Sequence, residues 1–260
     1  MSDAAKEKGA FEPLDRLDGR DVVVAGGLGA VGKATARRAA LLGARVVLLH
    51  RRTDAELAEA IDGLAGRGHF GVTASITDSG SLGRAAATVR ERCGKLDILV
   101  NTAGFTKPVP AADLEALDDA LIDAIFQANW RGVFATIRAF RPLLEASGDG
   151  LVVNVSSISA TTGVGSNLAY VAAKAGLDVL GKALARALAP KVRVLTVSPG
   201  VVDSGFVPGR GSDFNAKAAA TTPLKRIGTP DDVAAAIVAC ATQLRFATGQ
   251  TFVVDGGRSL

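Results

Sequence analysis

Residues 21–33 read DVVVAGGLGAVGK, a β-branched run that passes through a glycine-rich turn into a segment of helical spacing. Gly27, Gly29 and Gly32 satisfy the GxGxxG pattern, in which glycines permit a tight turn and let the backbone approach a pyrophosphate. The stretch therefore predicts the first strand, turn and helix of a dinucleotide-binding unit. Two other interpretations stay open. The same glycines also fit the start of a nucleoside-triphosphate loop, although Ala34 stands where that loop needs a hydroxyl, and a tight turn can serve packing without a ligand.

Six further β-branched runs alternate with Ala- and Leu-rich segments of helical spacing. Most runs are apolar on both faces, which is typical of parallel strands covered by helices above and below. We therefore expect an α/β fold, a single Rossmann-type doubly wound domain with a seven-stranded parallel sheet flanked by helices on both faces. The predicted strands span residues 21–26, 44–50, 69–75, 95–101, 150–157, 191–198 and 250–256. The predicted helices begin near Ala30, Asp54, Asp78, Ala111, Asn167 and Pro230.

The chain is expected to form one domain with two less regular parts. Residues 1–20 are predicted to be a flexible N-terminal lead-in, and residues 21–260 a single dinucleotide-binding and catalytic domain. Residues 203–222 form the one long stretch without a clear period, which is typical of a lid or binding loop, so we expect a substrate lid at about 203–222. Because ligands of open α/β sheets lie beyond the carboxyl ends of the strands, the site is expected at that edge.

Composition excludes several classes of protein. The chain has 260 residues, 22% of them charged and 5% aromatic, and a formal net charge of +4. So small a basic excess with few aromatic side chains argues against nucleic acid as a partner. No apolar run reaches the roughly 18 residues of a membrane span, so we expect no membrane partner and a cytoplasmic protein. Cys93 and Cys240 are single and far apart, so no metal site is expected.

The end of the second predicted strand indicates which dinucleotide to expect. A carboxylate there would hold the ribose 2′-hydroxyl of NAD and repel a 2′-phosphate, but this strand ends His50-Arg51-Arg52. Arginine can bind a phosphate through two parallel hydrogen bonds. NADP(H) is therefore favoured over NAD(H), unless these arginines only coat a solvated loop.

Tyr170 is the only tyrosine of the chain, and Lys174 follows it by four residues. This spacing puts both side chains on one face of a helix, one turn apart. An ammonium near a phenol favours the phenolate, so we expect the pKa of Tyr170 to be lowered and Tyr170 to exchange a proton near neutral pH. A tyrosine at a helix interface beside an exposed lysine is the structural alternative.

Other polar residues converge on the same region. Ser157 lies at the end of the fifth predicted strand, and Asn129 is an amide among otherwise apolar helical residues. Taken singly, such residues are usually caps or satisfied core groups. Their combination with the tyrosine and the lysine favours a catalytic site.

The chain resembles the classical short-chain dehydrogenase/reductase family over nearly everything from Asp21 to Leu260. The residues that carry the resemblance are the glycine turn, Asn101-Thr102-Ala103-Gly104, Asn129, Ser157, Tyr170-x-x-x-Lys174, Ser198-Pro199-Gly200 and the closing segment from Gly249 to Gly257.

The resemblance implies roles for these residues. Tyr170 would be the general acid in reduction and the base in oxidation, and Ser157 would hydrogen-bond the substrate oxygen. Asn129 would help to hold a water in a proton relay, and Lys174 would bind the nicotinamide ribose while lowering the pKa of the tyrosine. The cofactor-binding residues would be Gly26, Gly29, Val31, Gly32, His50, Arg51, Arg52, Ser75, Ile76, Asn101, Ala103, Gly104, Tyr170, Lys174, Pro199, Gly200, Val202 and Ser204.

The sequence departs from the family pattern at several positions. They are Ala25 for a threonine, Ala30 for a glycine, Thr102 for an asparagine, Ser75 for an aspartate and Leu195 for an asparagine. These changes concern the cofactor more than the chemical step.

We therefore expect an NADP(H)-preferring oxidoreductase that transfers a hydride between nicotinamide and a small-molecule carbonyl or secondary alcohol. The resemblance further implies a homo-oligomer, usually a tetramer, with interfaces near 111–145, 168–189 and the C-terminal segment. A 3-oxoacyl thioester reductase acting on an acyl carrier protein is the alternative within the enzymes, with Arg131, Arg138 and Arg141 as docking candidates opposed by the acidic 145–149 loop. A non-catalytic dinucleotide-binding sensor is the alternative outside them. The pocket walls are expected at Ser159, Val164 and Phe105, under a lid at 206–214, so a mostly apolar substrate is expected.

Overall fold

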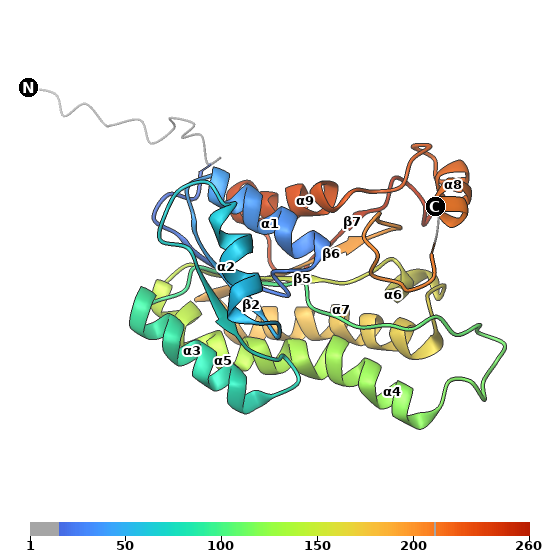
Figure 1. Ribbon diagram of the computed structural model, residues 1–260, viewed down its shortest axis with the longest axis horizontal. Helices are drawn as coiled ribbons and strands as arrows, with labels where there is room; N and C mark the ends of the chain where they lie inside the picture. Colours follow the sequence, from blue (N-terminus) through green and yellow to red (C-terminus); the bar gives the residue numbers. More distant parts are fainter. Residues whose placement is uncertain (1–15, 211) are drawn as a thin grey trace, which may run out of the picture.

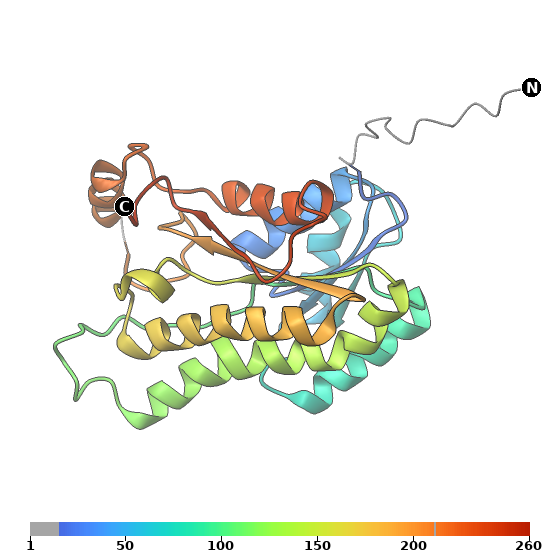
Figure 2. The same ribbon diagram turned by 180° about the vertical axis from the view of Figure 1, so that it is seen from behind.

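The computed structural model describes residues 16–210 and 212–260 and has one sheet between two layers of helices (Figures 1 and 2). All neighbouring strands pair in parallel, in the order β3-β2-β1-β4-β5-β6-β7. The strands are β1 Asp21–Ala25, β2 Arg45–His50, β3 Phe70–Thr73, β4 Ile98–Asn101, β5 Gly150–Val155, β6 Val192–Pro199 and β7 Thr251–Val254. The predicted seven-stranded parallel sheet is confirmed. The order reverses between β1 and β4, which is where open α/β sheets bind their ligands.

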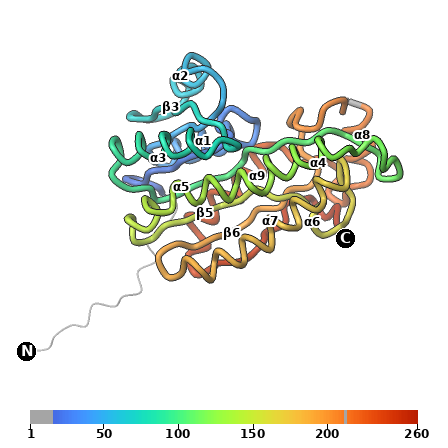
Figure 3. The backbone as a smooth tube through the Cα atoms, turned by 90° about the horizontal axis from the view of Figure 1, so that it is seen from below, coloured from blue at the N-terminus to red at the C-terminus, as the bar shows by residue number. Residues whose placement is uncertain are grey.

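Helices cover both faces of the sheet. In Figure 1, α1, α2 and α9 lie above the sheet and α3, α5 and α7 below it, and Figure 3 shows the lower three side by side. The helices are α1 Ala30–Leu41, α2 Asp54–Asp62, α3 Ser79–Cys93, α4 Asp119–Phe126, the π-helix η1 Gln127–Arg131, α5 Gly132–Ser147, α6 Ser159–Thr162, α7 Leu168–Leu188, α8 Ser212–Thr221 and α9 Pro230–Thr242. α6 and α8 lie together at one end of the molecule (Figure 1).

The core forms on the two sides of the sheet because successive strand residues point to opposite faces. Val22 and Val24 of β1 join the cluster under α1 and α9, whereas Val23 and Ala25 join the cluster under α3, α5 and α7. In β1, β2 and β3, polar side chains occur only at the ends of the strands. The rest of each strand is apolar, as expected for a strand covered by helices on both faces. The strands are thereby held rigidly, and their carboxyl ends form a fixed edge.

Two predicted elements differ in the structure. The helix expected from Ala111 begins at Asp119, because the side chain of Asp118 accepts a hydrogen bond from the backbone N–H of Leu121 and caps the helix there. The stretch expected to be irregular, 203–222, contains α8, because its second half reads DFNAKAAAT, which is rich in good helix formers. Of that stretch, the described residues 203–210 precede the helix.

The expected lead-in lies mostly outside the described residues. Of residues 16–20, Leu17 is buried, and its backbone N–H donates to the carbonyl oxygen of Leu42. Arg20 forms an ion pair with the buried Asp97. The chain is therefore tied to the domain from Leu17 onward. No helix of the described part of the chain is long and apolar enough to cross a membrane.

Candidate active site

The predicted site residues gather at the carboxyl edge of the sheet. The glycine turn follows β1, Asn101 ends β4, Ser157 follows β5 and Pro199 ends β6. α7 brings Tyr170 and Lys174 to the same edge, since Lys174 reaches the carbonyl of Val155 at the end of β5. Parallel pairing thus places segments far apart in the sequence side by side.

The glycine turn leaves no room for side chains. Gly26 has φ +86°, and a Cβ there would lie 2.6 Å from the backbone nitrogen of Ala103. A Cβ at Gly32 would collide with the carbonyl oxygen of Gly26. Gly29 caps α1 without any side-chain hydrogen bond, so the backbone N–H groups of the first helical turn point past the strand end. This glycine-lined helix N-terminus can receive a pyrophosphate.

Thr102 replaces the usual asparagine without opening the turn. Its hydroxyl donates to the carbonyl oxygen of Ala25 at 2.8 Å, and the backbone N–H of Ala103 donates to the same oxygen at 3.0 Å. Ala25 and Thr102, which both differ from the family pattern, are thus joined by a hydrogen bond that connects β1 to the segment after β4.

Asn129 fixes the backbone of the segment that follows β4, at Gly104 and Phe105. It is fully buried in η1, and its Nδ2 donates to the carbonyl oxygens of Phe105 at 2.6 Å and Ile125 at 2.9 Å. A Cβ at Gly104 would lie 2.8 Å from the Asn129 Oδ1, so only glycine fits there. The π-helical turn, a form common at functional sites, sets this amide against the Gly104-Phe105 backbone. Since both N–H groups of the amide are taken by protein carbonyls, its side chain positions this loop.

The end of β2 is strongly positive. Burial lowers the pKa of His50, and the charges of Arg52, Arg51 and Lys33 lower it further. Arg52 is paired with Glu56 at 2.9 Å, whereas Arg51 is exposed and makes no ion pair with any residue in 16–210 or 212–260. Arg51 and Lys33 are thus the cations available to an anionic group at this strand end. Lys33 was not among the predicted residues, although it directly follows Gly32 in the sequence.

Tyr170 and Lys174 are both buried on one face of α7, and Asn167 caps the helix by accepting from the Tyr170 backbone N–H at 2.7 Å. The Lys174 Nζ lies 5.7 Å from the centroid of the Tyr170 ring and donates to the Val155 carbonyl at 2.7 Å. The side chain of Ser157 lies close enough to Tyr170 to lower the pKa of the phenol, and it donates to the Ser159 hydroxyl at 3.0 Å. The structure therefore brings the serine, the tyrosine and the lysine together.

The expected lowering of the tyrosine pKa is wrong for the protein alone. Burial raises the pKa of Tyr170 to about 12, although the Ser157 hydrogen bond and the charge of Arg210 act in the opposite direction. Burial also lowers the pKa of Lys174 to about 8, against the charge of Asp178. Removal from water is the largest cause of both shifts, because desolvation disfavours each charged form.

Two polar groups behind the lysine were missed in the sequence. Asp178 lies one turn after Lys174 on α7, and burial raises its pKa while Ser156 and Lys174 lower it. Asn154, in the middle of β5, accepts a hydrogen bond from the Nδ2 of Asn101 at 2.9 Å. The Oδ1 of Asn101 and the Nδ2 of Asn154 have no hydrogen-bond partner, although both are buried. Two features of the sequence could have indicated these groups. Asp178 follows Lys174 by four residues, and Asn154 is a polar residue within an otherwise apolar strand.

The remaining predicted residues line the same edge. Ser75 bonds Thr77 through its hydroxyl at 2.9 Å, and Ile76 packs against Gly132. A Cβ at Gly200 would lie 2.9 Å from the Asp255 Cα, and Val202 forms a bridge with Gly228. Val31 packs against the core cluster under α1, and Ser204 is part of the segment before α8. These contacts fix the backbone at the positions where the resemblance places the cofactor.

The segment expected to be a lid contacts the tyrosine through Phe206. The ring centroids of Phe206 and Tyr170 are 6.1 Å apart, and the same phenylalanine reaches within 3.5 Å of the Cβ position of Gly104. Phe105 and Val164 are largely exposed, and Ser159 is buried at the start of α6. Phe206 thus places an apolar ring beside the phenol, whereas the pocket walls at Phe105, Val164 and Ser159 stay a prediction.

These residues fit a nicotinamide dinucleotide. Gly26, Gly29 and Gly32 form a close-packed turn without Cβ atoms that could hold a pyrophosphate, and positive charge lies at the end of β2. The glycine turn follows β1, and Lys174 contacts the end of β5. Only β4 lies between these two strands in the sheet. In the described ranges, no three His, Cys, Asp or Glu side chains form a candidate metal site.

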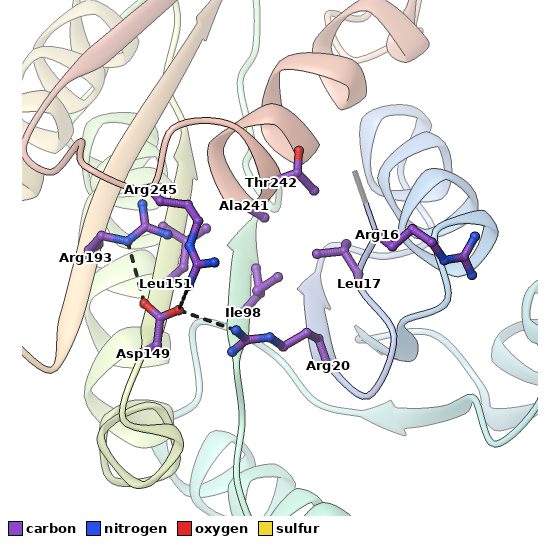
Figure 4. A pocket seen from close by; sticks show the side chains of 10 residues that line it. All are labelled: Arg16, Leu17, Arg20, Ile98, Asp149, Leu151, Arg193, Ala241, Thr242 and Arg245. Atoms are coloured by element: carbon purple, nitrogen blue, oxygen red, sulfur yellow. Dashed lines mark hydrogen bonds and ion pairs between the residues drawn. The ribbon is translucent and has the colours of Figure 1, made fainter. Parts of the chain in front are cut away.

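A pocket lies at the opposite edge of the sheet, where β1, β5 and β6 begin (Figure 4). There Asp149 accepts from Arg245 at 3.2 Å and from Arg20 at 3.4 Å, and the Arg193 Nε lies 4.0 Å away. Arg193 also donates to the carbonyl oxygens of Leu244 and Ala247. This network ties the beginnings of β1, β5 and β6 to the segment after α9, and it is remote from Tyr170.

The chain is similar to known oxidoreductases over most of its length. A family model described as enoyl-(acyl carrier protein) reductase matches residues 26–259. A protein of Streptomyces violaceoruber, assigned as ketoacyl reductase 2 of the granaticin polyketide synthase, is 36% identical over 92% of this chain and 95% of its own. Cis-4-hydroxycyclohexanecarboxylate dehydrogenase of Sinomonas cyclohexanicum is 34% identical over 92% of this chain and 96% of its own. The crystal structure of a short-chain dehydrogenase/reductase of Brucella melitensis, named as a glucose/ribitol dehydrogenase, superposes with a TM-score of 0.86 at 29% identity, covering 94% of this chain and 98% of that one.

Proposed function

This chain belongs to the short-chain dehydrogenase/reductase family, and we propose that it is an NADP(H)-preferring oxidoreductase in which Tyr170 exchanges the proton. As a member of that family it binds a nicotinamide cofactor and acts on the CH–OH or C=O group of a small molecule. The observation that carries the proposal is the meeting of Ser157, Tyr170 and Lys174 at the end of β5.

The three side chains have distinct tasks. The bound nicotinamide supplies or accepts the hydride. In reduction, the Tyr170 hydroxyl donates its proton to the carbonyl oxygen of the substrate, and in oxidation the same oxygen takes a proton from the alcohol. The Ser157 hydroxyl donates a hydrogen bond to that substrate oxygen and stabilises the charge that develops on it.

Lys174 and Asn129 support this exchange. With its pKa lowered to about 8, Lys174 still carries most of its charge at neutral pH, and a cation one helical turn from the phenol favours loss of the tyrosine proton. Asn129 holds Gly104 and Phe105 in place, and its Oδ1 keeps a lone pair for a water of a proton relay.

The preference for NADP(H) rests on the end of β2. Arg51 is exposed and unpaired in the described part of the chain, and Lys33 lies close enough to lower the pKa of His50. A 2′-phosphate placed there would gain charge-assisted hydrogen bonds, whereas no carboxylate at the strand end receives a 2′-hydroxyl.

Reduction of a 3-oxoacyl thioester on an acyl carrier protein is the second candidate. The names of the matching family and of the ketoacyl reductase relative favour it. The acidic loop at 145–149 opposes it less than the sequence suggests. Glu145 is paired with Arg141 at 2.7 Å, and Asp149 is held by Arg20 and Arg245 at the far edge of the sheet.

The experiment is consumption of NADPH and of NADH by the purified protein with a panel of ketones, sugars and free and carrier-bound 3-oxoacyl thioesters. We expect reduction of at least one carbonyl class with a higher kcat/KM for NADPH. Higher turnover on the carrier-bound thioester than on the free one would select the second candidate. Tight NADPH binding without reduction of any carbonyl would instead support the dinucleotide-binding sensor and contradict the proposal.

We further propose a homo-oligomer, with a tetramer as the expected state, and a cytoplasmic location. Exposed apolar side chains on the expected interface helices support the oligomer, among them Phe126 of α4, Leu168 and Val179 of α7. Apolar surface of this kind is commonly covered by a partner.

A further inference from the structure

Arg210 is a cation of the lid without an acidic partner. It is exposed and lies two residues before the start of α8, with its guanidinium carbon 4.2 Å from the centroid of the Phe214 ring. In the described ranges it forms no ion pair, and the charged groups that act on its pKa are Tyr170 and Arg258, neither of them a carboxylate. The ring of Phe214 therefore orients a positive charge that the protein itself leaves uncompensated.

This cation lies at the mouth of the proposed active site. The charge of Arg210 is close enough to lower the pKa of Tyr170. Phe206, four residues earlier in the same segment, lies 6.1 Å from the tyrosine, measured between ring centroids. The segment from Phe206 to Arg210 thus contacts the tyrosine ring at one end and carries a positive charge near the phenol at the other.

The surroundings of the lid are positive as well. Arg258 donates to the carbonyl oxygen of Ala218 and to the hydroxyls of Thr221 and Thr222 at the end of α8, and its charge lowers the pKa of Arg210. Asp213, in the first turn of α8, forms no ion pair with Arg210 in the described ranges, and two further acids of this region have partners of their own. Asp203 accepts from the Nδ2 of Asn215, and Asp255 accepts from the backbone N–H groups of Gly257 and Ser259.

The walls beneath the cation are apolar. Phe206 lies beside the Tyr170 ring, and Phe105 after β4 and Val164 between α6 and α7 also expose apolar side chains. A ligand suited to both features has an apolar body and a negative group beyond its reacting carbonyl. Building on the proposed oxidoreductase function, we propose that the substrate is an oxo acid or hydroxy acid whose carboxylate is bound by the guanidinium of Arg210.

The test compares acids with their neutral esters. The probes are 3-oxobutanoate, 4-oxopentanoate and 5-oxohexanoate, each against its methyl ester, reduced with NADPH by the wild type and by Arg210→Gln. We expect the substitution to lower kcat/KM about 10- to 100-fold for at least one acid, mainly through KM, because a charge-assisted hydrogen bond is lost. The matching ester should change less than about twofold, and Arg210→Lys should restore part of the preference for the acid.

Arg67→Gln, which removes an exposed arginine from another part of the chain, is the matched control and should leave both ratios unchanged. Calorimetric binding of the same acids in the presence of NADP+ gives a readout independent of turnover. Equal effects of Arg210→Gln on acid and ester, or no preference for any acid in the wild type, would overturn the carboxylate site while leaving the oxidoreductase function intact. Acids that bind through Arg210 without being reduced would support the anion site and contradict the proposed reaction.

Discussion

Burial decides the protonation of the reacting residues. Tyr170 and Lys174 are both buried, and the pKa of the phenol rises to about 12 while that of the ammonium falls to about 8. The sequence predicts their adjacency from the spacing of four, but it does not predict how completely the helix would remove them from water. The protein alone therefore holds the phenol protonated at neutral pH, the form that donates a proton in carbonyl reduction.

This protonation predicts an asymmetric pH dependence. Only the phenolate accepts a proton from an alcohol, and the raised pKa of Tyr170 leaves little phenolate at neutral pH, so the rate of alcohol oxidation should rise with pH by up to about tenfold per unit between pH 6 and 8. Carbonyl reduction should not rise over the same range, because its donor is already protonated. Initial rates in both directions, measured in one buffer series, check this. An oxidation rate that falls with pH would contradict it.

Arg51 gives a second prediction at the level of single residues. Arg51→Ala removes the unpaired cation at the end of β2, and we expect the Kd for NADPH to rise about 10-fold or more, since a charge-assisted contact to a phosphate is lost. The Kd for NADH should stay nearly constant. Fluorescence titration with both cofactors measures the ratio, and Arg67→Ala provides the control. A parallel loss of affinity for both cofactors would place Arg51 outside the 2′-phosphate site.

Among the elements, those with strong capping signals were predicted well from the sequence. Thr53, Asp78, Asn167 and Thr229 cap α2, α3, α7 and α9 with their side chains, so these helices begin where expected. The misplaced start of α4 and the π-helical turn around Asn129 could not be predicted in the same way. A π-helical turn depends on packing against Gly104 and Phe105, which are distant in the sequence.

The turn between β1 and α1 should tolerate no side chain. Gly32→Ala would bring a Cβ against the carbonyl oxygen of Gly26, and we expect the Kd for NADPH to rise about 10- to 100-fold, because the helix must move from the strand end. Gly83→Ala is the matched control, since a Cβ there meets nothing within 4 Å in α3. It should raise the free energy of unfolding by about 0.5–1 kcal/mol and leave cofactor binding unchanged. If Gly32→Ala and Gly83→Ala bound NADPH with equal affinity, the pyrophosphate would not lie close to the glycine turn.

At the scale of the whole molecule, the sheet and its two layers were predictable because both faces of the apolar strands must be covered. The lid was only partly predictable. Residues 203–222 lack a hydrophobic period, yet half of them form α8, which is held by the contacts of Arg258 with its last turn. The approach of the Arg210 charge to Tyr170 becomes visible only in three dimensions.

The proposed tetramer gives a prediction for the molecular surface. Val179 of α7 is 64% exposed and lies in the expected interface, so Val179→Glu should shift the protein to smaller species by placing charge in a buried contact. Leu41→Glu, on the exposed end of α1 outside the expected interfaces, should leave the assembly unchanged. Light scattering coupled to size-exclusion chromatography gives the mass of each species. A monomeric wild type would contradict the prediction.

The most direct test of the central claim is the rate of carbonyl reduction by Tyr170→Phe. The change removes one oxygen from a buried ring, so the fold and the affinity for NADPH should remain, and loss of the tyrosine absorbance verifies the variant because the chain has one tyrosine. We predict a fall of about 10²- to 10⁴-fold in kcat/KM with NADPH binding preserved. Turnover equal to that of the wild type would show that another group supplies the proton.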